Sequence, residues 1–248
     1  MGYTPALIDD FDDDILDTNK WTITQSPGAT ESDGTLNMAC VADYPRVEGS
    51  ALYDLTSGIL AAKLSASGTR SSGTEFYIGA RDGSGNAVSA LGTPLTAYVA
   101  FQPSGSATIS NEEIIDTEVG VGPNWVDGTW WGIGNMGNDN VVRMYNSPDG
   151  ETWYEMANCK VGGTFDKSHA GLVFMAGVWD GTTPDLVAHF DDATYWVVES
   201  LSYQKRRVRS GGVWVYATPK VRVNGEWVVA SPKPKIDGEW FLPWKSDA

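Results

Sequence analysis

The stretch TEFYIGARDGSGNAVSAL, residues 74–91, decides the fold class. Its first half alternates apolar and polar side chains, as a half-buried β-strand does, and its second half is another apolar-rich run. Between them, residues 82–86 (DGSGN) supply the glycines and short polar side chains of a tight turn. The stretch therefore predicts two antiparallel strands.

The same pattern recurs along the chain, whereas helical periodicity is nearly absent. Further strand candidates are residues 95–102, 141–145, 152–156, 170–179 and 186–198. Between two of them, residues 147–150 (SPDG) form a type I turn with proline at its favoured position. Short strands separated by turns roughly every 8–12 residues predict an all-β fold, a β-sandwich or jelly roll.

Composition limits the function classes. The chain has 248 residues, with 17 Lys and Arg against 32 Asp and Glu, for a formal charge of −15. This acidic balance argues against a nucleic-acid partner, because binding to phosphates needs Lys and Arg. We expect no membrane insertion, because no apolar run approaches the ~18–20 residues that cross a bilayer.

The charge is unevenly distributed. Residues 1–204 contain 28 acidic and 8 basic side chains, whereas residues 205–248 contain 4 acidic and 9 basic ones. Such a break in composition predicts two modules, a sandwich over 1–204 and a separate carboxy-terminal segment over 205–248.

That segment repeats with a period of 13 residues. The repeated positions are Trp214, Trp227 and Trp240, and Gly212, Gly225 and Gly238. Each unit centres on Gly-Gly, Asn-Gly or Asp-Gly between β-forming residues, which is typical of a two-residue type I′ turn. The segment therefore predicts three small hairpins, stacked on one another or on the sandwich, or used for docking or oligomerisation. Contact with a membrane or nucleic acid is a further alternative.

Three short motifs carry a family resemblance. Residues 8–14 (IDDFDDD), 147–153 (SPDGETW) and 188–192 (AHFDD) resemble the opening strand, a hairpin and the closing strand of concanavalin A-like (laminin G/glucanase-like) jelly-roll domains. The resemblance covers residues 7–198 and implies that the first and last strands of the domain lie side by side. Because this fold hosts many functions, the motifs indicate the fold alone.

The repeats carry a second resemblance. Units such as VRVNGEWVVASPK, residues 221–233, are similar to carboxy-terminal repeats of minor tail proteins from phages of actinobacteria. Together, the two resemblances imply a virion protein of the phage tail, made in the host cytoplasm, that presents a glycan-binding type of sandwich to the host surface. Its expected partners are other tail proteins, further copies of itself and a host cell-surface glycan. A capsid-associated decoration protein is an open alternative.

No catalytic residues are predicted. Retaining enzymes of the glucanase family carry E-x-D-x-E on one strand, whereas the nearest match here is EEIIDTE, residues 112–118. Alternation places Asp116 and Glu118 on one face and Glu113 on the other. We therefore expect a non-enzymatic structural or adhesin protein, with a tail-associated glycoside hydrolase or depolymerase as the alternative.

Glycan contact would use exposed aromatic rings. The candidates are Trp125, Trp130, Trp131 and Trp179. Trp130 and Trp131 are adjacent and must face opposite sides of a strand, so at least one of them is expected in the core.

Two other sets of residues have possible chemistry. If the first and last strands pair, Asp10, Asp12, Asp191 and Asp192 come together and could bind calcium; otherwise they form a solvated acidic edge that discourages aggregation. No other cofactor is expected. Cys40 and Cys159 are expected to be buried thiols, and His189 to be a hydrogen-bonded histidine on a strand.

Overall fold

A computed structural model describes residues 6–25, 28–92, 99–114, 128–134, 139–150, 153–180 and 185–197, and the backbone of six short strands between 206 and 240. The chain divides into two compact units, Met1–Val198 and Glu199–Ala248. Each unit is described by itself.

Every regular element of the described residues in the first unit is a β-strand. The strands are β1 (Ala6–Asp9), β2 (Trp21–Gln25), β3 (Ala29–Ser32), β4 (Thr35–Ala39), β5 (Arg46–Gly49), β6 (Gly58–Ser67), β7 (Thr74–Asp82), β8 (Ala87–Gly92), β9 (Val99–Ser104), β10 (Ala107–Ile114), β11 (Thr129–Gly134), β12 (Val141–Ser147), β13 (Tyr154–Gly163), β14 (Ala170–Val178) and β15 (Val187–Val197).

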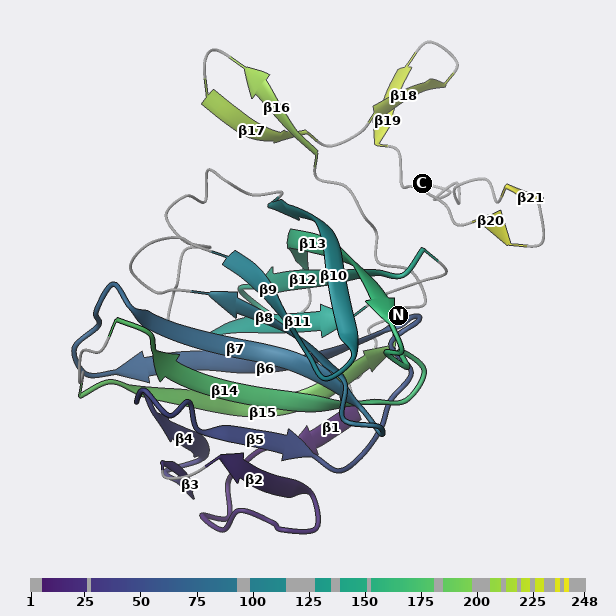
Figure 1. Ribbon diagram of the computed structural model, residues 1–248. Coiled ribbons are helices and arrows are strands. Elements are labelled where there is room, and N and C mark those ends of the chain that lie inside the picture. Colours follow the sequence, from purple (N-terminus) through teal and green to yellow (C-terminus); the bar gives the residue numbers. More distant parts are fainter. Residues whose placement is uncertain are drawn as a thin grey trace. The chain divides into compact units, whose positions relative to one another are not determined.

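These strands form two antiparallel sheets that lie face to face (Figure 1). Sheet A has the order β10-β13-β12-β11-β6-β15-β4-β3, with β1 also paired to β15, and sheet B has the order β2-β5-β14-β7-β8-β9. The predicted all-β jelly-roll sandwich is therefore confirmed. The predicted hairpin over 74–91 is β7-β8, with Arg81 opposite Ala87 next to its turn. The implied pairing of the first and last strands is present as β1-β15.

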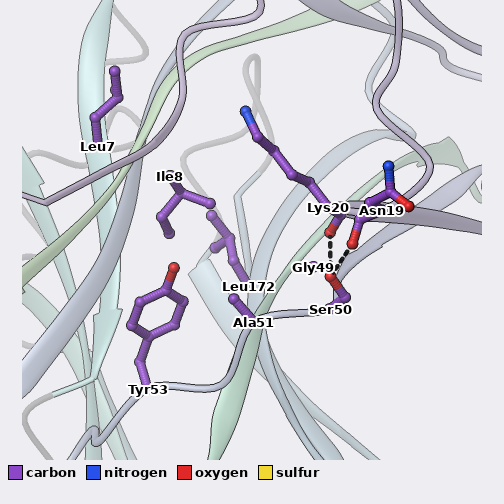
Figure 2. A pocket seen from close by; sticks show the side chains of 9 residues that line it. All are labelled: Leu7, Ile8, Asn19, Lys20, Gly49, Ser50, Ala51, Tyr53 and Leu172. Atoms are coloured by element: carbon purple, nitrogen blue, oxygen red, sulfur yellow. Dashed lines mark hydrogen bonds between the residues drawn. The ribbon is translucent and has the colours of Figure 1, made fainter.

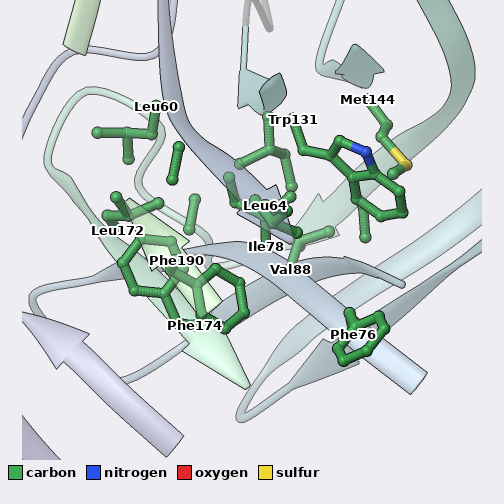
Figure 3. Close-up of a cluster of buried hydrophobic side chains, with 14 of the residues drawn as sticks. Leu60, Leu64, Phe76, Ile78, Val88, Trp131, Met144, Leu172, Phe174 and Phe190 are labelled. Carbon is green, nitrogen blue, oxygen red and sulfur yellow. The ribbon is translucent and has the colours of Figure 1, made fainter. Parts of the chain in front are cut away.

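The core lies between the sheets and follows the alternation of each strand. On β7, Phe76 and Ile78 face inward, into the same cluster as Leu60 and Leu64 of β6 (Figure 3). Phe174 of sheet B meets Phe190 of sheet A, with ring centroids 4.5 Å apart. Around it lie two further aromatic rings, those of Trp21 and Phe11.

The thiols and the strand histidine have structural roles. Cys40 and Cys159 are both free and buried, and burial raises the pKa of each thiol to about 12. The His189 ring lies between Ser67, whose Oγ is 2.8 Å from its Nε2, and the Asn37 side chain at its Nδ1. The predictions for these three residues are confirmed.

The second unit contains three antiparallel pairs. They are β16 (Arg206–Ser210) with β17 (Val213–Ala217), β18 (Lys220–Val223) with β19 (Glu226–Val229), and β20 (Lys235–Ile236) with β21 (Glu239–Trp240). In each pair the register leaves two residues between the strands, as a two-residue turn requires. Trp214, Trp227 and Trp240 lie on β17, β19 and β21, whereas Gly212, Gly225 and Gly238 lie outside the described residues. Stacking of the hairpins stays a prediction.

No helix within the described residues is both long enough and apolar enough to cross a membrane.

We expect Phe174→Ala to lower the free energy of unfolding by about 3–5 kcal/mol, because it removes a fully buried ring and leaves a cavity between the sheets. Urea denaturation followed by tryptophan fluorescence would measure this loss. Ile15→Ala is the control: that side chain is 70% exposed, so its removal should change stability by no more than about 0.5 kcal/mol. Equal losses in the two variants would contradict the assigned core.

Candidate functional site

The outer face of sheet B carries a carboxylate that is largely sheltered from water. Because Phe76 and Ile78 face the core, Glu75 and Tyr77 on the same strand point away from it. Nevertheless, Glu75 is only 9% exposed and Tyr77 only 1%. Tyr77 belongs to a second, smaller hydrophobic cluster on this outer face. A carboxylate in such a setting is a candidate for chemistry.

Two tyrosine hydroxyls hold the Glu75 carboxylate. Tyr44 and Tyr77 both donate to its Oε2, at 2.8 and 2.6 Å. Burial, followed by the interaction with Glu75, raises the pKa of both tyrosines, so both remain protonated donors at neutral pH. No hydrogen bond within the described residues engages Oε1 of Glu75. One oxygen is therefore fixed, and the other is available to a ligand.

Tyr44 is held over the sheet by two constraints. Its backbone has φ of 49°, a left-handed conformation that is uncommon for a residue with a side chain. Its ring lies over Gly177, where an added Cβ would come within 2.1 Å of the ring. Backbone strain of this kind persists where the surrounding structure enforces it, and it often occurs at functional sites.

A second carboxylate lies beside Glu75. The Asp180 carboxylate fills the space that a side chain at residue 73 would occupy, since a Cβ on Gly73 would lie 2.2–2.6 Å from its atoms. Gly73 belongs to the turn just before β7, two residues from Glu75 in the chain. After burial and Glu75, Asp180 is a further cause of the raised pKa of Tyr44.

Trp179 lies directly before Asp180, at the end of β14. Its ring is 64% exposed, and its backbone N–H donates to the carbonyl of Gly73 at 3.0 Å. This predicted glycan-contact residue is thus an exposed aromatic residue, and Asp180 follows it in the chain. We call the group Tyr44, Glu75, Tyr77, Trp179 and Asp180 the sheet B site. Sequence reasoning missed four of these five residues, because they come from different parts of the chain.

The other carboxylate on this face has a structural role. Glu48 of β5 forms ion pairs with Arg46 and Arg81, whose Nε atoms lie 2.8 and 3.1 Å from its carboxylate oxygens. The two guanidinium groups offset its charge.

The other predicted tryptophans lie elsewhere. Trp130 is partly exposed on the outer face of sheet A, and its ring is 6.4 Å from that of Trp196. Trp131 is 1% exposed and packs in the core over Gly92, so its prediction as a glycan contact is wrong: alternation turns it inward. Trp125 lies outside the described residues, as do Asp116 and Glu118.

The acidic segments meet, but they do not form a recognisable metal centre. Asp10 and Asp12 are exposed, whereas Asp191 and Asp192 are partly buried on β15. Burial, then Asp192 and, more weakly, Asp12 raise the pKa of Asp191. Among the described residues no three His, Cys, Asp or Glu side chains are grouped so that they could hold a metal ion. Calcium at this edge stays a prediction.

A buried acid lies next to this edge. Glu31 on β3 is 8% exposed, and burial, followed by the neighbouring Asp13 and Asp9 carboxylates, raises its pKa from 4.5 to about 7. Asp9 itself accepts from Trp21 Nε1 at 2.6 Å and from Lys20 Nζ at 3.1 Å. Glu31 therefore keeps a proton at mildly acidic pH, and that proton reduces repulsion among the three carboxyl groups.

Figure 2 shows a pocket of about 280 Å³ at the amino-terminal strand. Its lining residues are Leu7, Ile8, Asn19, Lys20, Gly49, Ser50, Ala51, Tyr53 and Leu172. The Ser50 hydroxyl is already used, because its hydrogen bonds run to the carbonyls of Asn19 and Lys20, at 2.6 and 3.0 Å. No carboxylate lines this pocket, so it lacks the acid and base that the sheet B site offers.

Comparison with known proteins supports the fold. No family model and no curated protein matches the sequence. A solved structure from work on endo-acting O-glycanases with which members of the human gut microbiota initiate mucin breakdown is 12% identical; the match covers 76% of this chain and 97% of that chain, with a TM-score of 0.53. Lectin I-B4 from Griffonia simplicifolia in its metal-free form is 13% identical over 78% of this chain and 99% of that chain, with a TM-score of 0.47. The chain thus has a concanavalin A- and galectin-like sandwich fold.

The comparison also corrects one expectation. We predicted a non-enzymatic protein, and this is overturned by the O-glycanase structure, which shares the fold across nearly its whole length. The predicted phage origin receives no support from these matches.

We expect the stability of the protein to fall as pH rises from about 5 to about 8, because of Glu31. The folded state binds the Glu31 proton more tightly than the unfolded state does, so raising the pH through this range favours unfolding. Glu31→Gln should flatten this part of the profile and stabilise the protein at pH 8 by on the order of 1 kcal/mol or more. Chemical denaturation at several pH values would measure both effects. Asp33→Asn, an exposed acid on the same hairpin, should leave the profile unchanged; equal slopes for wild type and Glu31→Gln would contradict the assignment.

Proposed function

We propose that the sandwich is a glycoside hydrolase that binds a glycan at the sheet B site and cleaves it with Glu75 and Asp180. One observation carries the proposal: a buried carboxylate is fixed by two phenolic donors, and one of these, Tyr44, also senses the charge of Asp180, which follows the exposed Trp179 in the chain. The O-glycanase that shares the fold makes O-linked mucin glycans the first substrate to test.

The roles proposed here for Glu75 and Asp180 are those of an inverting enzyme. Inverting glycosidases hold their two carboxyl groups about 6.5–9.5 Å apart, which leaves room for a water molecule, whereas retaining enzymes hold them at about 5–5.5 Å. Glu75 is suited to the role of general base, because its fixed Oε2 leaves Oε1 to take a proton from water. Asp180 is then the general acid that protonates the oxygen of the leaving sugar.

The remaining residues of the sheet B site bind and orient. Trp179 presents its exposed ring to the face of a pyranose, and an aromatic platform at the edge of a site fixes the sugar next to the carboxylates. Tyr44 and Tyr77 hold the Glu75 carboxylate in one orientation, so that it is already positioned for reaction when the substrate binds.

We further propose that this enzyme is a tail-associated depolymerase of a phage. The support is the likeness of the 13-residue units to phage tail repeats, together with the two-residue turns of the three hairpins. In this proposal the protein is made in the host cytoplasm, and the repeats join copies of the chain to one another and to other tail proteins. A location on the capsid instead of the tail is the competing proposal, and immunogold labelling of virions would separate the two.

Replacing either carboxylate should abolish most hydrolysis. We expect Glu75→Gln and Asp180→Asn each to lower kcat on a soluble O-glycan oligosaccharide by about 10²–10⁴-fold, the usual contribution of a general acid or base. Reducing-end release would measure the rate, and NMR of the first product would show inversion at the anomeric carbon. The matched control is Asp33→Asn, which changes an exposed carboxylate between β3 and β4 of the other sheet and should leave kcat unchanged. Loss of activity in Asp33→Asn but not in Glu75→Gln would overturn the assigned site.

The repeats should control assembly and not catalysis. We expect the full chain to sediment as an oligomer, and the triple variant Trp214→Ala, Trp227→Ala, Trp240→Ala to sediment as a monomer, because the three rings would cover one another or a second copy. Analytical ultracentrifugation would measure this, with kcat on the soluble oligosaccharide as the control. An unchanged sedimentation coefficient would contradict a role in oligomerisation.

A further inference from the structure

The outer face of sheet A carries a second group of aromatic rings, far in the sequence from the sheet B site. Trp130 of β11, Trp153 just before β13 and Trp196 of β15 lie together: Trp196 is 6.4 Å from Trp130 and 5.7 Å from Trp153, both edge to face. All three are partly exposed. Their neighbours Trp131 and Ile133 point into the core, so these rings are on the side of the sheet that faces away from it.

Glycines shape this surface. A Cβ at Gly132 would lie 3.1 Å from the Trp153 ring, and a Cβ at Gly150 would lie 3.0 Å from Nε1 of Trp130. Gly150 also has φ of 72°, which a side chain would strain. Trp196 is fixed separately, because its Nε1 donates to Thr194 Oγ1 at 2.9 Å. The cluster is therefore held in place by its backbone and is preorganised for a ligand.

Polar groups follow the aromatic rings on the same face. Glu155 lies opposite Tyr145, and Asn158 opposite Arg143, in the β12-β13 register. The Asn158 amide donates to Glu155 at 3.0 Å and to Glu113 at 3.5 Å, and Arg143 lies 3.7 Å from Glu155. Hydroxyl-rich ligands need this combination of flat apolar rings with carboxylate and amide groups beside them.

We propose that this face, defined by Trp130, Trp153, Trp196, Glu155 and Asn158, is a second glycan-binding surface. Charge on this face is mixed: Arg143 pairs with Asp139 and Glu155, and Lys63 lies opposite Trp130. The proposal takes its ligand class from the proposed function, but it concerns a different surface.

Two binding surfaces on opposite faces of one sandwich have a functional consequence. A polymer held at the sheet A face would raise the local concentration of its own segments near the sheet B site. Avidity of this kind gains affinity without any new contact at the catalytic residues. The effect should be large for long polymers and absent for short soluble oligosaccharides.

The test uses the full chain carrying Glu75→Gln, so that binding is measured without cleavage. The probe is immobilised desialylated mucin. We expect the dissociation constant for this mucin to rise about tenfold on adding Trp130→Ala or Trp153→Ala, and about threefold on adding Asn158→Ala, in line with the loss of one stacking contact and one hydrogen bond.

Controls separate this proposal from unfolding and from the proposed function. Trp130→Phe keeps a ring and should retain most binding, and thermal melting should be unchanged in every variant that is scored. In the otherwise wild-type chain, Trp130→Ala should leave kcat/KM on a soluble oligosaccharide unchanged, whereas Trp179→Ala should lower it. Unchanged mucin binding in both folded Trp→Ala variants would overturn the second surface while leaving the hydrolase proposal intact. Mucin binding without hydrolysis by the wild-type chain would instead contradict the hydrolase proposal and leave the second surface intact.

Discussion

The contact between Phe174 of sheet B and Phe190 of sheet A is the interaction on which the rest of the sandwich depends. Each strand alternates, so a strand can bury one face only if a second sheet covers it. This contact joins the two sheets at the centre of the core, and the Trp21 ring completes it from the opening segment. Because the two inner faces pack against each other, contacts with other molecules fall to the two outer faces.

The two outer faces are used differently. On sheet B, glycine at 177 and a strained backbone at Tyr44 let a tyrosine lie over the strands and shelter Glu75 from water. On sheet A, Gly132 and Gly150 make room for indole rings. In both places a missing Cβ creates the space that a large aromatic ring fills. Aromatic rings beside carboxyl and amide groups suit carbohydrate recognition, and in the proposed function only the sheet B face places a carboxylate in reach of a reacting bond.

Local signals in the sequence predicted much of the fold. Alternation in residues 74–91 identified the β7-β8 hairpin, and the dipeptides at each repeat identified the two-residue turns of the second unit. The same alternation correctly required that Trp130 and Trp131 face opposite ways, although it could not say which one is inward. These signals succeed because each depends on neighbours in the chain, through backbone geometry and turn chemistry.

The sequence by itself determined that the chain is an acidic all-β protein with a basic repeated segment, because composition and periodicity do not depend on contacts between distant residues. Only the tertiary structure decided where the chemistry lies. In the sequence, nothing distinguishes Glu75 from other strand residues. In the structure, Tyr44, which is 31 positions away, donates a hydrogen bond to it, and the pairing of β14 with β7 brings Asp180 to the same end of the sheet. Carboxylates become a site through desolvation and the approach of distant groups, and no local pattern records which strands will be neighbours.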